Sequence, residues 1–253
     1  MKNIALFDLD NTLLAGDSDY NWNLFLIKQG VLDEQSYQAR NEGYFADYQQ
    51  GCLDIKGFLH FQFETLCRHP RQLLEHWRAE YVQTVIKPML APQAQALVAE
   101  HRAAGDTLVV ITATNSFVTR PIASLFGIDN LIASDPEEID GQFTGEIAGV
   151  PSFQEGKVVR LRAWLGAQGL ALTDFERSYF YSDSHNDLSL LQQVTHPVAV
   201  DADAQLTQYA QAQGWRCLSL RGLKTLQNLA NGMRCKTSAT QEATYQPDRR
   251  ASK

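Results

Sequence analysis

The chain has 253 residues, 44% of them hydrophobic, which suits one large domain or one domain that carries a smaller insertion. Its 22 lysines and arginines against 29 aspartates and glutamates give a net charge of −7, which argues against nucleic acid or an anionic membrane as the main partner. The start is unlike a signal peptide, and no run reaches the roughly 18 apolar residues of a spanning helix, so we expect a cytoplasmic protein that binds a small molecule.

The first expected strand is the apolar run Ile4 to Phe7. The span 17–87 that follows shows no β-alternation and several amphipathic stretches, so it predicts an inserted helical segment. Helices are expected at 20–29, 34–50, 55–67 and 70–87. This span holds 12 of the 25 aromatic residues, and for each one we favour packing in a helical bundle over contact with a ligand.

The rest of the chain alternates between helical and strand patterns. Expected helices are 93–102, 117–126, 157–165 and 188–194; expected strands are 108–111, 131–133, 179–181, 198–200 and 216–220, with a hairpin around 141–147. Apolar strands alternating with helices predict an α/β fold with a buried parallel sheet, and such a sheet binds ligands beyond the carboxyl ends of its strands. The polar stretch 236–253 lacks periodicity, and we expect it to be disordered.

Four cysteines are spread along the chain without a CxxC pair: Cys52, Cys67, Cys217 and Cys235. We therefore expect reduced thiols rather than a disulfide framework or a zinc site.

Asp8 and Asp10 follow the first strand directly, two residues apart, so both carboxylates can point to the same side. One would attack phosphorus while the other manages the proton of the leaving group, and Thr12 would fix the turn. In isolation, two aspartates after a strand are more simply explained as a turn.

Thr112 ends the strand 108–111, before a helix. Its hydroxyl and nearby backbone N–H groups, such as that of Ala113, are suited to holding phosphate oxygens at a helix N-terminus. The alternative is a plain helix cap.

Lys157 stands at the start of an expected helix, where a cation opposes the helix dipole. An unfavourable charge there suggests a function, although a solvated surface lysine is equally compatible with this residue alone.

Asp183 and Asp187 flank a polar turn after the strand 179–181, with Asn186 between them. Hard carboxylate oxygens suit Mg²⁺, completed by phosphate and water. His185 is better explained as a neighbour of this site than as a ligand or base. Repulsion among the carboxylates predicts a raised pKa for Asp10, which fits a general acid.

This ordered set, from the Asp8-Leu9-Asp10-Asn11-Thr12 segment to Asp187, resembles the haloacid dehalogenase (HAD) superfamily of phosphohydrolases. The resemblance implies a Rossmann-like three-layer core, 1–16 and 88–222, with an all-helical cap, 17–87, and a C-terminal extension, 223–253. It implies that Asp8 is the nucleophile, Asp10 the acid and base, and Thr112 and Lys157 phosphate ligands. It also implies Mg²⁺ held by Asp8, Asp183 and the backbone carbonyl of Asp10, with Asp187 in support.

Within the superfamily the chain looks like the phosphoserine-phosphatase group, in which an acidic residue after the first motif binds the amine of the substrate; Asp17 occupies that position. Where those enzymes use a cap arginine for a carboxylate, the stretch 51–63 offers only Lys56. Segments around Asp19 and Gly156 look closer to members described as histidinol-phosphatases, which implies a role in amino-acid biosynthesis. A phosphorylated amine without a carboxylate would suit Asp17 and Asp19.

Two functions without hydrolysis are alternatives to a phosphatase: a receiver domain and a binding module. A receiver domain phosphorylated on aspartate would carry its acceptor on a middle strand and would have no need of an aromatic cap. A silent binding module would be expected to have lost one of four residues, and all are present: Asp8, Asp10, Lys157 and Asp183.

Overall fold

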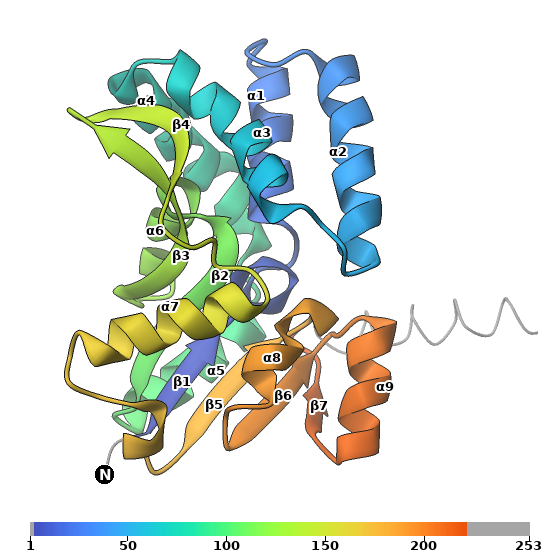
Figure 1. Ribbon diagram of the computed structural model, residues 1–253, viewed down its shortest axis with the longest axis vertical. Helices are drawn as coiled ribbons and strands as arrows, with labels where there is room; N and C mark the ends of the chain where they lie inside the picture. The colour runs from blue at the N-terminus through green and yellow to red at the C-terminus, as the bar shows by residue number, and fades with distance from the viewer. Residues whose placement is uncertain (1–2, 222–253) are drawn as a thin grey trace, which may run out of the picture. The chain divides into compact units, whose positions relative to one another are not determined.

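A seven-stranded sheet is the centre of the fold in the computed structural model, which describes residues 3–221 (Figure 1). Its strands are β1 (Ile4–Phe7), β2 (Thr107–Asn115), β3 (Asn130–Ile139), β4 (Gln142–Ala148), β5 (Ser178–Ser182), β6 (His196–Val200) and β7 (Arg216–Leu218). The order across the sheet is β4-β3-β2-β1-β5-β6-β7, and only the β3–β4 hairpin pairs antiparallel. Phe7 is in register with Val110 of β2 and Tyr181 of β5, so the carboxyl ends of these three strands meet at one edge.

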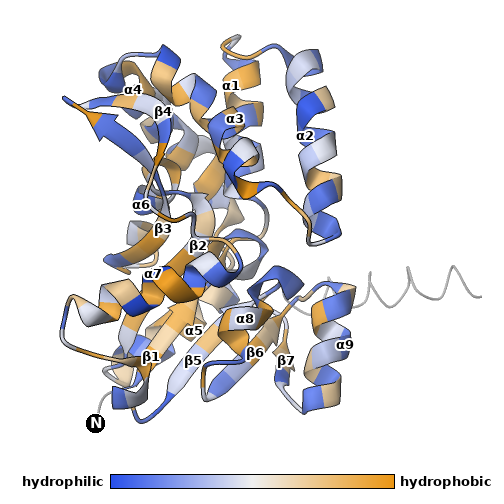
Figure 2. Cartoon of the chain, viewed as in Figure 1, coloured by the Kyte–Doolittle hydropathy of each residue, from blue (hydrophilic) through white to orange (hydrophobic). Residues whose placement is uncertain are grey.

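Helices cover both faces of the sheet. They are α5 (Pro92–Ala103) and α6 (Ser116–Leu125) on one face, and α7 (Glu155–Gly166), α8 (Leu188–Leu191) and α9 (Ala204–Gln213) on the other. Side chains alternate along β1, so Ala5 and Phe7 pack into the first layer while Ile4 and Leu6 pack into the second. Hydrophobic residues accordingly concentrate in the central strands (Figure 2). The predicted α/β, Rossmann-like three-layer fold is confirmed.

The predicted insertion is helical and lies between β1 and α5 (Figure 1). It comprises α1 (Ser18–Lys28), α2 (Glu34–Gln49), α3 (Ile55–Arg68) and α4 (Arg71–Tyr81), followed by the short helical turns η2 (Val82–Ile86) and η3 (Lys87–Met89). The sequence favours packing for each of its twelve aromatic residues, and six of them are buried while the other six are partly or fully exposed; the buried ones are Trp22, Phe25, Tyr37, Phe61, Phe63 and Tyr81. Residues 1–220 form one compact unit, so the boundaries at 17 and 87 stay a prediction.

Several predicted elements differ from the structure: for example, the helix expected over 188–194 ends at Leu191, and the strand expected over 131–133 extends over Asn130–Ile139. The strand expected to end at Thr112 continues to Asn115, because the side chain of Asn115, not that of Thr112, caps α6 by accepting from Val118 N at 3.0 Å. The helix expected over 70–87 is α-helical only to Tyr81 and changes pitch through η2 and η3; Pro88, in η3, has no N–H to donate to an α-helical bond.

Among the described residues, Cys52, Cys67 and Cys217 are free, and no helix is long and apolar enough to cross a membrane. Cys235 and the tail 236–253 lie outside the described residues.

Candidate active site

Lys157 joins two carboxylates from different strands. Its Nζ lies 2.7 Å from Asp8 Oδ1, directly after β1, and 2.8 Å from Asp187 Oδ2, after β5. All three side chains are at least nine-tenths buried. Burial lowers the pKa of Lys157, but Asp187 and Asp8 raise it more, so the net shift is upward and the ammonium stays charged.

The backbone that leads into α7 and positions Lys157 is conformationally restricted. Gln154, which caps α7, has a positive φ of 47°. A Cβ at Gly156 would lie 1.9 Å from the carbonyl oxygen of Pro151, so only glycine fits there. Glu155 at the start of α7 complements the helix dipole that Lys157 opposes, and the two buried carboxylates explain why a lysine is tolerated.

Asp183 is held by the first motif. Thr12 Oγ1 donates to Asp183 Oδ1 at 3.2 Å, and Thr12 Oγ1 accepts from Asp183 N at 3.1 Å. Burial, followed by the charges of Asp8 and Asp187, raises the pKa of Asp183 well above its ordinary value. The β1 and β5 loops are thus joined both through Lys157 and through Thr12.

Asp10 faces the entry to α1 and the end of β2. Its Oδ1 accepts from Ser18 N at 2.6 Å, and its Oδ2 accepts from Thr114 Oγ1 at 2.7 Å. Burial and then the charge of Asp17 raise the pKa of Asp10 to about 6, although the bonds from Ser18 and Thr114 oppose the shift. Repulsion among carboxylates was the cause predicted for a raised pKa of Asp10 with substrate bound, whereas burial is the larger cause here.

Thr112 and Ala113 lie in β2 rather than at a helix N-terminus. Thr112 is buried, and its Oγ1 accepts from Thr114 N at 3.2 Å. Thr114 in turn binds Asp10, so this part of β2 borders the carboxylates of the first motif.

Asp17 and Asp19 lie at the start of α1. Asp17 caps the helix, because its Oδ1 accepts from Asp19 N and from Tyr20 N, each at 2.8 Å. Asp19 is 5% exposed, and its Oδ1 accepts from Asn115 Nδ2 at 3.2 Å. Burial, then the charges of Asp17 and Asp10, raise the pKa of Asp19 well above its ordinary value.

Asn186 turns toward the helical insertion instead of toward Lys157. Its Oδ1 accepts from Gln154 Nε2 at 2.8 Å, and its Nδ2 donates to the carbonyl oxygen of Tyr48 at 3.2 Å. His185 lies beside it, with Nδ1 2.8 Å from Asp203 Oδ2. The hydrogen bonds of both residues therefore go to groups other than Asp8, Asp183 and Asp187 in the described structure.

The donor set fits a hard divalent cation. Asp8 is buried and Asp183 is partly buried, and burial, opposed by Lys157, raises the pKa of Asp8 to about 7. Lys157 is the only buried lysine or arginine among residues 3–221. The ligand set that the resemblance implies is the carboxylates of Asp8 and Asp183 with the backbone carbonyl of Asp10. Such oxygen ligands favour Mg²⁺ over a transition metal.

The short polar side chains that hydrogen-bond to the carboxylates were not predicted from the sequence. Ser182 Oγ donates to Asp187 Oδ2 at 2.6 Å, and Thr114 binds Asp10. Both residues lie within three positions of a predicted site residue at the end of a strand. That proximity was the only feature of the sequence that could have indicated their role.

Comparisons with known proteins agree with this arrangement. Residues 5–192 match the family model described as haloacid dehalogenase-like hydrolase. The chain belongs to the haloacid dehalogenase-like hydrolases. It is 45% identical over 222 residues to a histidinol-phosphatase of Neisseria meningitidis, covering 87% of this chain and all of that protein.

Two solved structures are similar in fold. A Bordetella pertussis protein of unknown function has a TM-score of 0.82 at 47% identity, covering 87% of this chain and 99% of that one. A substrate-bound phosphoserine phosphatase has a TM-score of 0.62 at 20% identity, covering 90% and 98%. The family predicted from the sequence is confirmed, and the chain is a phosphatase of the HAD family.

Proposed function

We propose that this HAD phosphatase is a Mg²⁺-dependent phosphomonoesterase that hydrolyses a small phosphorylated amine or amino alcohol, with histidinol phosphate as the best candidate. The observation that carries the proposal is the buried Asp8–Lys157–Asp187 arrangement at the ends of β1 and β5. The relative named histidinol-phosphatase supports the choice of substrate.

In the first step, an Asp8 carboxylate oxygen attacks phosphorus and the bond from phosphorus to the ester oxygen breaks. Asp10 gives its proton to the departing alcohol oxygen, which yields an aspartyl-phosphate and the free alcohol. The raised pKa of Asp10, about 6, keeps part of this carboxyl protonated near neutral pH.

In the second step, the now ionised Asp10 takes a proton from water as the water attacks phosphorus. The bond between phosphorus and Asp8 breaks, inorganic phosphate leaves, and Asp10 is protonated again. Ser18 N and Thr114 Oγ1 hold Asp10 in one orientation for both steps.

Lys157, Thr112 and the backbone N–H of Ala113 are the proposed phosphate ligands. The fixed charge of Lys157 lies 2.7 Å from Asp8, so it neutralises the nucleophile and a phosphoryl oxygen bound beside it. Asp8, Asp183 and the Asp10 carbonyl would hold Mg²⁺, with Thr12, Asn186 and Asp187 in support. When bound, the ion supplies Lewis-acid stabilisation of phosphoryl charge.

A cationic leaving group suits the acidic entry to α1. Asp19 is buried and Asp17 is partly buried near Asp10, and neither has a lysine or arginine partner in the described structure. Burying negative charge without a cation is costly, and an ammonium or imidazolium would offset it. The second candidate is phosphoserine or another small metabolite ester, because a mycobacterial relative at 27% identity is named phosphoserine phosphatase.

The test is a comparison of kcat/KM for four esters in the presence of Mg²⁺: histidinol phosphate, phosphoserine, phosphoethanolamine and glucose 6-phosphate. We expect the cationic esters without a carboxylate to be preferred by at least about tenfold, since one offset buried charge is worth on the order of 1–3 kcal/mol. Preference for the sugar phosphate would exclude an amine-recognising role for Asp17 and Asp19.

A further inference from the structure

The insertion is attached to the core in two different ways. The side formed by α3 and α4 packs on α6 and β4 within a continuous apolar core that includes Phe63, Leu74 and Phe117. By contrast, α2 buries only Tyr37, and it is largely hydrophilic in Figure 2. An element with few buried apolar contacts opens at low free-energy cost.

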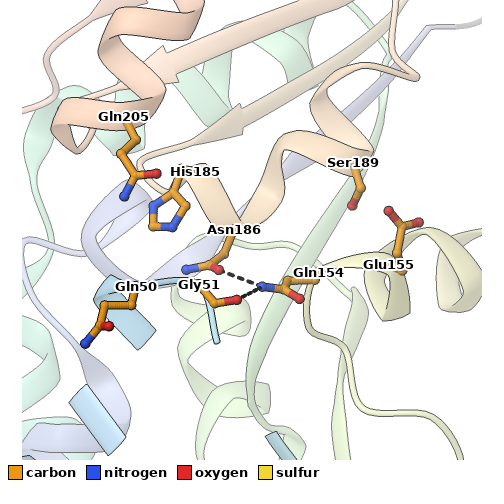
Figure 3. A pocket seen from close by; sticks show the side chains of 8 residues that line it. All are labelled: Gln50, Gly51, Gln154, Glu155, His185, Asn186, Ser189 and Gln205. Atoms are coloured by element: carbon orange, nitrogen blue, oxygen red, sulfur yellow. Dashed lines mark hydrogen bonds between the residues drawn. The ribbon is translucent and has the colours of Figure 1, made fainter. Parts of the chain in front are cut away.

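The turn that joins α2 to α3 meets the core through neutral hydrogen bonds. Tyr48 Oη donates to Ser184 Oγ at 2.9 Å, and Asn186 Nδ2 donates to the carbonyl oxygen of Tyr48 at 3.2 Å. Gln154 Nε2 donates both to the carbonyl oxygen of Gly51 at 3.2 Å and to Asn186 Oδ1 at 2.8 Å (Figure 3). We call these five residues the latch: Tyr48, Gly51, Gln154, Ser184 and Asn186.

The core side of the latch is built from the loops that carry the catalytic groups. Ser184 and Asn186 lie between Asp183 and Asp187, and Gln154 stands three residues before Lys157. Ser184 and Asn186 are 5% and 6% exposed, so their polar groups depend on these partners. The turn is therefore hydrogen-bonded directly to both loops.

The turn itself is shaped for this contact. Gly51 has a φ of +72°, and a Cβ there would lie 3.4 Å from His185 Nε2. Beside the turn is a polar pocket of about 270 Å³, lined on the core side by Gln154, His185 and Gln205 (Figure 3). An apolar interface would resist separation in water, whereas polar groups beside an open pocket exchange their partners for water at little cost.

From these contacts, we propose that the latch is a releasable fastening of the α2–α3 turn and that Gln154 is a positioning residue for the reaction. With the latch closed, Gln154 ties the turn to the loop of Asp183 and Asp187. With the latch open, the turn lifts from Ser184 and Asn186 and admits substrate. The catalytic part of this inference rests on the proposed function; the fastening itself does not.

Gln154→Met keeps the length of the side chain and removes both donors. We expect hydrogen exchange of the backbone amides in 48–52 to quicken by about tenfold, as loss of two hydrogen bonds predicts, while exchange in α3 stays unchanged. Tyr48→Phe removes one hydroxyl and should act in the same direction by about threefold. Gln205→Met is the matched control, because Gln205 meets the same turn only at 3.5 Å from the carbonyl oxygen of Gln49.

In the kinetic arm, Gln154→Met should raise KM about tenfold and leave kcat within about threefold. Unchanged exchange in 48–52 for both Gln154→Met and Tyr48→Phe would overturn the latch, and so would a tenfold change in the Gln205 control. An equal loss of protection in α3 would also overturn it, because it would mean general destabilisation. Exchange is measured without substrate, so a wild-type protein inactive on every ester would refute the proposed function and leave this result standing.

Discussion

The two sides of the candidate active site are held by different physical interactions. Around Lys157, buried ionic contacts of 2.7 and 2.8 Å join loops from separate strands. At the α2–α3 turn, neutral hydrogen bonds hold the end of α2, and Tyr37 is the one buried side chain of that helix. The reacting groups are thus preorganised by charge and burial, whereas the α2–α3 turn is attached weakly enough to move.

The largest effect is expected where the ionic side is broken. Lys157→Met leaves Asp8 and Asp187 buried without their cation, which should destabilise the fold by about 3–5 kcal/mol and lower kcat/KM on the order of 10³-fold. Chemical denaturation and steady-state kinetics measure the two effects.

Arg162→Met is the control for that change, because Arg162 is exposed on the same helix and its one hydrogen bond among the described residues goes to Gln193. It should shift stability by less than about 0.5 kcal/mol. A Lys157→Met protein with wild-type stability and turnover would contradict the importance given to the ionic contacts.

The pKa of Asp10, about 6, predicts a pH dependence of the reaction. Since the protonated form donates to the leaving oxygen, kcat/KM for an alkyl ester should fall about tenfold per pH unit above 6. For p-nitrophenyl phosphate, whose leaving group needs no proton, the fall should be much smaller. Asp10→Asn should lower kcat/KM for the alkyl ester by about 10²–10⁴-fold.

The same pKa predicts a change of stability without metal. The folded-state pKa of Asp10 lies above its ordinary value of 3.8, so the folded protein binds more protons than the unfolded chain between about pH 4 and pH 6. Its contribution to stability is therefore greatest below pH 4 and is lost as pH rises through 6. Asp10→Asn should gain on the order of 3 kcal/mol relative to wild type at pH 8 but not at pH 4. Equal differences at both pH values would contradict the raised pKa.

The smallest effect is expected at the entry to α1. Asp19→Asn removes a buried charge but keeps the shape of the side chain, so discrimination between phosphoethanolamine and glucose 6-phosphate should drop about tenfold in kcat/KM. Turnover of p-nitrophenyl phosphate serves as the internal reference and should change less than about threefold. Undiminished discrimination would place the recognition of the amine elsewhere.

The sequence predicted the centre of the site because the reacting residues directly follow apolar strands. Asp8 and Asp183 end their strands, and Lys157 carries a charge that its place in a helix disfavours. The extension of β2 to Asn115 was not predictable, because the Thr112–Asn115 stretch offers both strand-forming and capping residues and tertiary contacts choose between them.

The latch was not predictable either. Gln154 and Tyr48 are 106 positions apart in the chain, and no local pattern distinguishes a glutamine that reaches a distant backbone carbonyl from one that faces water. Asn186 was predicted in support of the carboxylates; its contacts with Tyr48 and Gln154 arise only from the tertiary arrangement.

The covalent step through Asp8 is tested most directly by trapping the intermediate. Wild-type protein would be quenched in acid during turnover of a good ester with Mg²⁺ and digested, and the peptides would be mapped by mass spectrometry. One phosphoryl group is expected on the peptide that contains Asp8, and none in Asp8→Asn treated in the same way. A phosphoryl group on another residue, or rapid turnover by Asp8→Asn, would contradict the account.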